Sequence, residues 1–178
     1  AAKLNGNVED LDFNAGDFLA RVNADLVGKY VNIASRCAVF VQRKFAGELA
    51  AAGSDRLLAD CQAKSAEIAA LYESREFGKA LREVMALADL ANQFVDEQKP
   101  WELSKQPGSE QRLAQVCSVG INLFRVLTVY LKPVLPRLAA EAERFLNVPA
   151  LAWPDAAQPL PGGHRINEYR HLLNRVEE

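Results

Sequence analysis

The chain has 178 residues, of which 49% are hydrophobic and 25% charged, and its formal net charge at pH 7 is −2. This length suits one domain with one buried core, and the composition is that of an ordinary globular protein, not of a disordered or collagen-like one. A slightly acidic chain lacks the overall positive charge of a non-specific nucleic-acid binder, so any contact with nucleic acid has to be local and specific.

The cysteines and histidines follow no pattern typical of a metal site or a disulfide framework. Cys37, Cys61 and Cys117 are widely spaced, which favours free thiols in the core and a reducing, cytoplasmic location. His164 is assigned to a loop and His171 to a helix surface, and neither lies near a cluster of metal-binding residues, so we expect no metal. No uninterrupted apolar run is long enough to cross a membrane, and we expect no membrane partner.

The first residues, AAKLNGNVEDLDFN, contain no basic head followed by an apolar block, and therefore do not resemble a signal peptide. Because the sequence begins without Met, we expect it to be a piece of a longer protein.

Helical periodicity dominates the chain. From Asp17 onward, apolar residues recur at steps of three and four, which predicts a long helix with a broad buried face. Asn14 is its candidate N-cap and Gly47 its candidate stop. The buried stripe comprises Leu19, Val22, Leu26, Tyr30, Ile33, Cys37 and Phe40, widened by Val27, Val31, Ala34, Ala38, Val41 and Phe45.

Four further helices are expected in the bundle. The second follows residues 53–55, and the third starts near Glu76 and ends before Pro100, because proline disfavours helical geometry in the residue that precedes it. Ser109 is the candidate N-cap of the fourth helix, and Pro136 opens a short fifth helix that extends to Leu146.

The texture of the chain changes after residue 146. Residues 147–167 are rich in proline and glycine and predict an irregular connection, pinned by Leu151, Trp153 and Leu160. From Glu168 onward, a short amphipathic helix is expected, with Tyr169, Leu172, Leu173 and Val176 on its apolar face. The predicted fold is all-α: an antiparallel bundle of four to five helices over residues 1–146, and an irregular segment with a short C-terminal helix over residues 147–178.

The sequence contains no recognisable catalytic constellation. It has no glycine-rich phosphate loop and no nucleophile elbow, and no histidine lies near a cysteine or serine with an orienting acid. A freestanding enzyme is therefore the least favoured of the possible functions.

Two features could form a binding site. Asn32 and Arg36 lie four residues apart and share the polar side of the first helix with Asp25, Lys29 and Arg43. Taken alone, this pattern is more often an ordinary solvated face. Trp101 follows Pro100 in the polar stretch VDEQKPWELSKQPG, where an indole can either cover the end of the core or offer a surface to a ligand.

Three longer segments indicate a family. RVNADLVGKYVNIASRCAVF (21–40), SREFGKALREVMALADLANQFVDEQKPW (74–101) and INLFRVLTVYLKPVLPRL (121–138) resemble the anticodon-binding domain of bacterial methionyl-tRNA synthetases. The resemblance covers nearly the whole chain, including the final PLPGGHRINEYRHLLNRVEE, which in the family returns toward the catalytic domain. The synthetases for leucine, valine, isoleucine and cysteine have related bundles, but the combination of Asn32, Arg36 and Pro100-Trp101 favours methionine.

The resemblance implies that Asn32, Arg36, Pro100 and Trp101 read the CAU anticodon of methionine tRNA. Unpaired bases can stack on an aromatic ring while hydrogen bonds read their edges. Stacking does not discriminate between bases, so selection has to come from the amide of Asn32 and the guanidinium of Arg36. We expect Lys29, Arg43, Lys99 and Lys105 to contact phosphates, which position the RNA without specifying its sequence.

The resemblance also implies what lies outside this chain. The family's catalytic signatures, its zinc-binding insert and its C-terminal dimerisation appendage are absent from the sequence. ATP, and zinc in some members, therefore belong to the catalytic part of a parent ligase, and we expect no cofactor in this segment. Its expected partners are methionine tRNA and its own catalytic domain, not DNA. The alternative is a helical protein-interaction module, which predicts an exposed apolar groove and no clustering of Asn32, Arg36 and Trp101.

Overall fold

A computed structural model describes residue 1, residues 3–4, residue 7 and residues 14–175. Its first long helical run is continuous from α1 (Ala15–Arg21) through η1 (Val22–Val31) to α2 (Asn32–Phe45). The side chain of Asn14 caps the run by accepting a hydrogen bond from the backbone N–H of Asp17 at 3.0 Å, as predicted. The run ends at Ala46 and Gly47, which both have positive φ angles and make the predicted stop.

The middle of this run differs from the prediction, because η1 is wound as a π-helix. Steps of three and four in the sequence do not separate this wider winding from an ordinary α-helix. Gly28 lies in η1, and a Cβ atom there would approach the backbone oxygen of Asn23 to 3.3 Å. π-helical turns inside α-helices frequently occur at functional sites. This one ends directly before Asn32.

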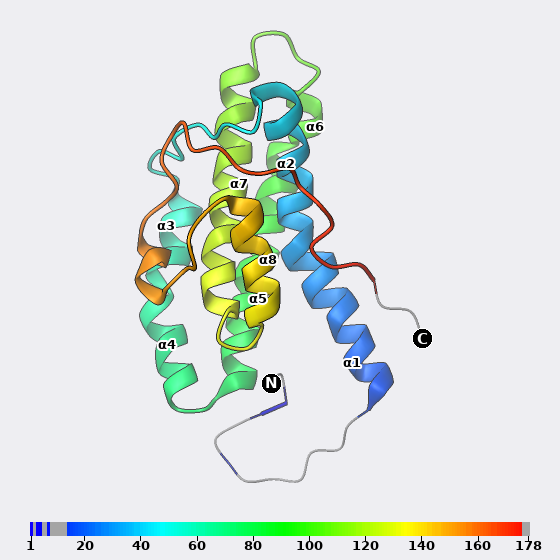
Figure 1. Ribbon diagram of the computed structural model, residues 1–178, viewed down its shortest axis with the longest axis vertical. Coiled ribbons are helices and arrows are strands. Elements are labelled where there is room, and N and C mark those ends of the chain that lie inside the picture. The colour runs from blue at the N-terminus through cyan, green and yellow to red at the C-terminus, as the bar shows by residue number, and fades with distance from the viewer. Residues whose placement is uncertain (2, 5–6, 8–13, 176–178) are drawn as a thin grey trace.

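The bundle runs up and down, so that consecutive long helices are antiparallel, as predicted. Figure 1 shows α7 in the middle, α3 and α4 on one side, the first helical run on the other and α8 in front. Apart from an isolated bridge between Glu48 and Arg165, the described residues contain no strand pairing. The remaining elements are α3 (Arg56–Ala63), α4 (Ser65–Glu73), α5 (Phe77–Gln98), α6 (Pro100–Leu103), α7 (Glu110–Leu131), α8 (Pro136–Leu146) and a 3₁₀ turn, η2 (Trp153–Ala157).

Helix α7 is the centre of the core. It is the one helix in the described part of the chain with the length and composition of a membrane span, and 89% of its most apolar window is buried by the other helices. Its apolar character therefore fits a core helix. Gly120 allows α2 to approach closely, since a Cβ atom on this residue would lie 2.4 Å from Sγ of Cys37. The three cysteines are free and buried, as expected.

Two helix starts agree with the prediction in position and differ in detail. Ser109 is the N-cap residue of α7, but its side chain does not cap the helix; its hydroxyl donates instead to the preceding carbonyls of Leu103 and Gln106. Pro100 follows the end of α5 as predicted, but the chain does not continue as a loop. Lys99 adopts the left-handed conformation (φ 47°), and Pro100 occupies the first turn of α6, where its missing N–H costs nothing.

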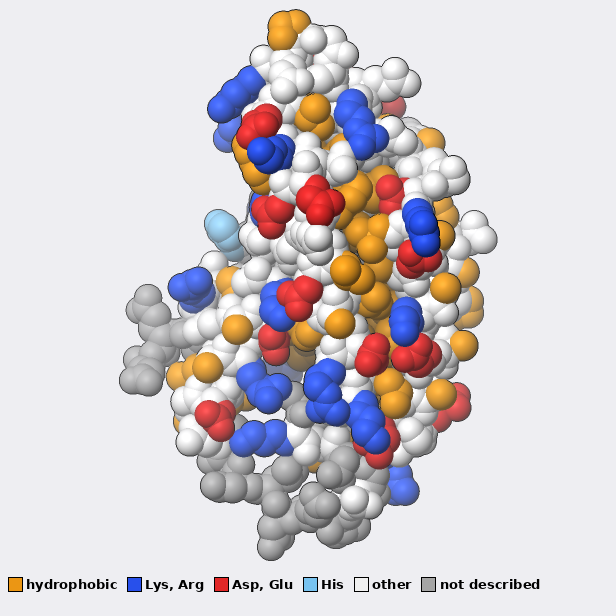
Figure 2. Space-filling view, turned by 180° about the vertical axis from the view of Figure 1, so that it is seen from behind, with side chains coloured by type: hydrophobic (Ala, Val, Ile, Leu, Met, Phe, Trp, Pro, Cys, Tyr) orange, Lys and Arg blue, Asp and Glu red, His pale blue; other side chains and the backbone are white. Residues whose placement is uncertain are grey.

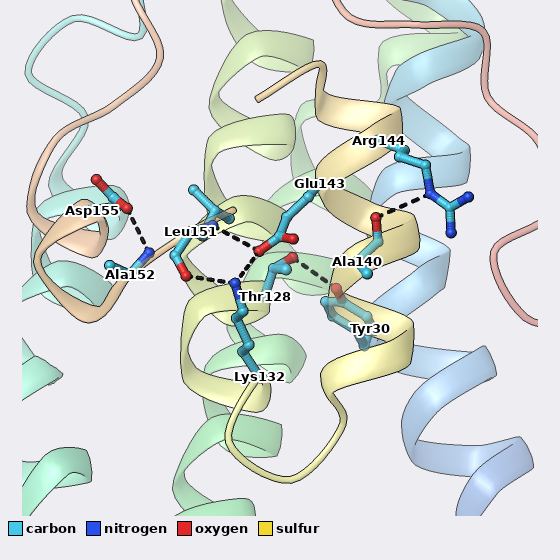
Figure 3. Close-up of polar contacts among 9 residues, drawn as sticks. All are labelled: Tyr30, Thr128, Lys132, Ala140, Glu143, Arg144, Leu151, Ala152 and Asp155. Carbon is cyan, nitrogen blue, oxygen red and sulfur yellow. Dashed lines mark hydrogen bonds and ion pairs between the residues drawn. The ribbon is translucent and has the colours of Figure 1, made fainter. Parts of the chain in front are cut away.

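A buried ion pair holds the irregular segment to the bundle. Nζ of Lys132, the C-cap residue of α7, lies 2.5 Å from Oε1 of Glu143 on α8 and also donates to the carbonyl of Leu151 at 2.7 Å (Figure 3). The same carboxylate accepts from the backbone N–H of Leu151. Leu151 and Leu160 are buried and Trp153 is half-buried, which agrees with the prediction that these three residues pin the segment.

The C-terminal helix was predicted wrongly. Residues 168–175 are not helical, and Val176 lies outside the described residues. A short amphipathic segment cannot sustain a helix alone, and this one instead packs its side chains against the bundle, with the ring of Tyr169 5.2 Å from that of Phe145. His171 therefore does not lie on a helix, whereas His164 lies in the irregular segment, with Nε2 2.7 Å from the carbonyl oxygen of Leu146.

Candidate nucleic-acid interface

The polar side of the first helical run faces α5 instead of open solvent. Lys29, Asn32 and Arg36 each contact the residue 60 positions later in the sequence. The residue numbers of the two partners increase together from one pair to the next, so the two helices run parallel with a constant register. The contacts join Lys29 to Asp89, Asn32 to Asn92 and Arg36 to Asp96.

Arg36 and Trp101 form the aromatic part of this site. The guanidinium carbon of Arg36 lies 5.0 Å from the centroid of the indole ring, within the distance of a cation–π contact. Nη2 of Arg36 donates to the carboxylate of Asp96 at 2.5 Å, and the Arg36 side chain is only 22% exposed, against 63% for Asp96. Trp101 is half-buried and packs against the core. The ring is thus part of the surface of the bundle and keeps an accessible part beside Arg36.

Asn32 lies one turn before Arg36 and is also half-buried. Its Nδ2 donates to Oδ1 of Asn92 at 3.0 Å. The Nδ2 of Asn92 in turn donates to the carbonyls of Lys29 and Ala88, at 3.0 and 2.9 Å. Both amides are therefore held in a defined orientation at the junction of the two helices.

Pro100 is buried directly before the indole. Lys99 directly follows α5, and its left-handed conformation changes the direction of the chain. The fixed φ angle of Pro100 then starts α6 in the new direction. The backbone that carries Trp101 is therefore restricted on both sides. Figure 1 places α6 at the upper end of the bundle, beside α2.

The four lysine and arginine residues expected at phosphates differ in their surroundings. Lys29 is engaged with Asp89 at 2.9 Å and Asp25 at 4.0 Å, and Lys99 lies 3.3 Å from Glu102. Arg43 and Lys105 are exposed and form no ion pair within the described part of the chain. Of the four, these two are the most available for an RNA phosphate.

The sequence interpretation missed the α5 side of the site. Asp89, Asn92 and Asp96 were not singled out, although they repeat the spacing of Lys29, Asn32 and Arg36, with acids in the positions that match the cations. Two helical segments with the same three-then-four spacing and complementary side chains would have indicated this pairing.

An apolar hollow of about 650 Å³ lies nearer the start of the first helical run. Phe18, which is 53% exposed, lines it together with Leu26, Met85 and Leu135. Lys29 and Asp89 form part of its rim, but Asn32, Arg36 and Trp101 do not line it. One expectation of the protein-interaction alternative is thus present. The other is that the candidate residues do not cluster, and the contact of Arg36 with Trp101 contradicts it.

The surface carries no uniform charge on the face seen from behind. Figure 2 shows acidic side chains interspersed among lysine and arginine side chains over much of this face. In the part of the chain that the structure covers, no group of three or more His, Cys, Asp or Glu side chains could hold a metal ion. What the Asn32, Arg36 and Trp101 side chains offer a ligand is therefore local hydrogen bonding and stacking, not a uniformly positive surface.

Sequence comparisons assign this bundle to a family. The family described as "Anticodon binding domain of methionyl tRNA ligase" matches residues 45–178. The chain belongs to this family of anticodon-binding domains. The matched range includes Pro100 and Trp101, and it begins after Asn32 and Arg36.

Similar proteins extend the likeness over the whole chain. The methionine–tRNA ligase of Methylibium petroleiphilum is 59% identical over 180 residues, and that of Thiobacillus denitrificans is 57% identical over 178 residues, each covering 99% of this chain. The chain spans about a quarter of the length of these curated relatives, 26% in both cases.

Solved structures share the fold. The ligand-free methionyl-tRNA synthetase of Mycobacterium tuberculosis superposes with a TM-score of 0.83 at 20% identity, covering 93% of this chain and 35% of that protein. The same synthetase in complex with methionyl-adenylate gives a TM-score of 0.82 at 19% identity, covering 90% of this chain and 33% of that protein. The predicted helical bundle is thereby confirmed.

Proposed function

We propose that this chain is the part of a methionine–tRNA ligase that reads the CAU anticodon of methionine tRNA. The observation that carries the proposal is the contact of Arg36 with Trp101, with Asn32 one turn before Arg36 at the junction of α2 and α5. Family membership supports the anticodon loop as the ligand.

In this proposal, different side chains supply stacking and selection. Trp101 offers a ring on which an unstacked base can lie, which contributes about 1–3 kcal/mol per base. Arg36 uses one N–H in its bond to Asp96 and keeps other donors of its planar fork for a base edge. A base that does not match leaves buried polar groups unpaired, at a cost of about 1–3 kcal/mol each.

The remaining steps belong to the proposed parent ligase. There, a catalytic domain outside this chain would activate methionine with ATP in the cytoplasm, and residues 147–178 would return toward that domain. Among the solved structures of similar fold, one synthetase is described as a complex with methionyl-adenylate, which supports an ATP-dependent parent. This chain would contribute recognition of the tRNA.

The experiment measures binding of labelled RNA hairpins to the wild-type chain and to two variants of Trp101. Trp101→Ala should weaken binding of a CAU hairpin by about tenfold or more, because a stacking platform is lost. Trp101→Phe keeps an aromatic face and should retain most of the affinity. Circular dichroism establishes that each variant is folded at the temperature used.

Two results would contradict the proposal. The first is a wild-type chain that does not prefer a CAU hairpin to a scrambled loop. The second is a folded Trp101→Ala variant with unchanged binding. In a full-length ligase, the same Ala variant should reduce aminoacylation and leave methionine activation intact; a parallel loss of both would mean that the ring is purely structural.

A further inference from the structure

Asn92 fixes the direction in which the amide of Asn32 points. A backbone carbonyl can only accept a hydrogen bond, and Asn92 lies against two of them, those of Lys29 and Ala88 at 3.0 and 2.9 Å. Both N–H groups of the Asn92 amide are therefore committed, and its Oδ1 has to face the other way. That oxygen meets Asn32, which must present its own Nδ2 at 3.0 Å.

The consequence for Asn32 is an outward-facing acceptor. Rotating its amide by 180° would bring its Oδ1 against Oδ1 of Asn92 and would lose the hydrogen bond between the two side chains. In the observed orientation, Oδ1 of Asn32 accepts no hydrogen bond from the residues that the structure describes. An asparagine that could otherwise serve as donor or acceptor is thus restricted to accepting at the position of its free oxygen.

We infer that Asn92 is a positioning residue that makes the site select cytosine over uracil as the first anticodon base. This inference rests on the proposed function. Cytosine carries an amino donor at the position where uracil carries a carbonyl acceptor. An outward-facing Oδ1 of Asn32 accepts from the cytosine amino group and opposes the uracil carbonyl.

Arg36 strengthens the same choice. It contributes only donors, and those that Asp96 does not use suit the ring nitrogen and carbonyl acceptors of cytosine. Uracil has an N–H in place of that ring acceptor, so it opposes both side chains. Asn92 touches neither base in this arrangement, because it acts through the orientation of Asn32.

The test compares two RNA hairpins that are identical except for loops containing CAU or UAU. Their dissociation constants are measured for the wild-type chain, Asn92→Ala and Asn92→Asp. Without Asn92, the Asn32 amide can rotate and offer a donor to uracil, so Asn92→Ala should lower the preference for CAU by about tenfold. Gln93→Ala is the matched control, because among the described residues the side-chain amide of the neighbouring Gln93 bonds only to Glu97, at 2.8 Å.

Asn92→Asp separates positioning from a general structural effect. The carboxylate still accepts from Nδ2 of Asn32 and keeps its oxygen outward, but it cannot donate to the two backbone carbonyls. This variant should bind both hairpins more weakly, because it adds negative charge and loses two hydrogen bonds, yet it should keep the CAU preference. A merely structural role would damage the Asp variant at least as much as the Ala variant.

The outcomes distinguish this inference from the proposed function. A preference unchanged in Asn92→Ala, or lost in Asn92→Asp, would overturn the inference and leave the proposed function standing. A wild-type chain with no preference between the loops would contradict the proposed function itself. If Asn92→Ala does not fold, the Asp variant decides alone, since a retained preference supports the inference and a lost one overturns it.

Discussion

The guanidinium of Arg36 lies over the indole of Trp101 at 5.0 Å, and the carboxylate of Asp96 holds it there at 2.5 Å. In the RNA-free protein, the ring therefore already has a planar partner. Under the proposed function, a base that stacks on Trp101 has to share the ring with Arg36 or displace it. The affinity for RNA would then depend on how readily Arg36 exchanges Asp96 for the RNA.

Arg36→Lys should weaken binding of the CAU hairpin by about tenfold although the charge is retained. Lysine has no planar fork and stacks less well on an indole, so both roles of the side chain are impaired. Titration of labelled hairpin measures the effect, and Arg21→Lys on the exposed side of α1 is the control. Equal affinities of Arg36→Lys and the wild type would show that only charge matters at this position.

Asp96→Asn should strengthen binding of hairpins by a few-fold, whatever their sequence. The substitution releases Arg36 from its ion pair and removes the negative charge of a side chain that is 63% exposed. Because the effect is electrostatic, it should diminish as salt is raised. Measurement of the dissociation constant between 50 and roughly 300 mM salt checks the prediction, which would be wrong if affinity fell at every salt concentration.

Arg43→Ala should weaken all hairpins alike and reduce the dependence of binding on salt. Arg43 has no ion pair among the described residues, and a phosphate contact contributes affinity without sequence preference. The slope of log K against log salt should decrease by about one ion. Arg137→Ala, in the first turn of α8 at the opposite end of the bundle from α6, is the matched control and should change neither quantity.

Gly120→Ala should destabilise the fold by about 1–3 kcal/mol, even though alanine is the better helix former. Its Cβ would lie 2.4 Å from Sγ of Cys37, in a part of the core with no space to relax. Urea denaturation measures the free energy of unfolding. Adding Cys37→Ala should recover much of the loss, and a double variant no more stable than Gly120→Ala would place the damage elsewhere.

Alkaline pH should destabilise the chain through its buried tyrosines. Burial raises the pKa of Tyr130 from 10.0 to about 12. The unfolded chain therefore loses this proton first, and the contribution of the neutral phenol is complete below pH 10 and lost as pH rises toward 12. Urea midpoints across this range should fall less steeply in Tyr130→Phe, whereas parallel curves would exclude a contribution from Tyr130.

The helices were predictable from the sequence because their apolar faces repeat over many turns. Asn14 and Pro136 marked helix starts correctly, since each acts through local geometry. Ser109 also marked the start of α7 correctly, although its hydroxyl donates to preceding carbonyls instead of capping the helix. The C-terminal helix was predicted wrongly, because packing of Tyr169 against the distant Phe145 decided the conformation there.

The candidate site was predictable in part, and for a similar reason. Arg36 and Asn32 could be placed on one helix face, but their partners are 60 residues away, and spacing along one helix does not reveal which neighbour it faces. The polar face therefore resembled a solvated one. The structure shows a half-buried junction, where the same side chains are restrained by Asn92 and Asp96.

The three contacts between the first helical run and α5 share one offset, and this has a mechanical consequence. If either helix slid by a single residue, Lys29, Asn32 and Arg36 would all lose their partners on α5 at once. The relative position of the two helices is therefore fixed by all three contacts together. Under the proposed function, this shared pairing would hold the side chains of Asn32 and Arg36 at fixed positions relative to α5 before RNA binds.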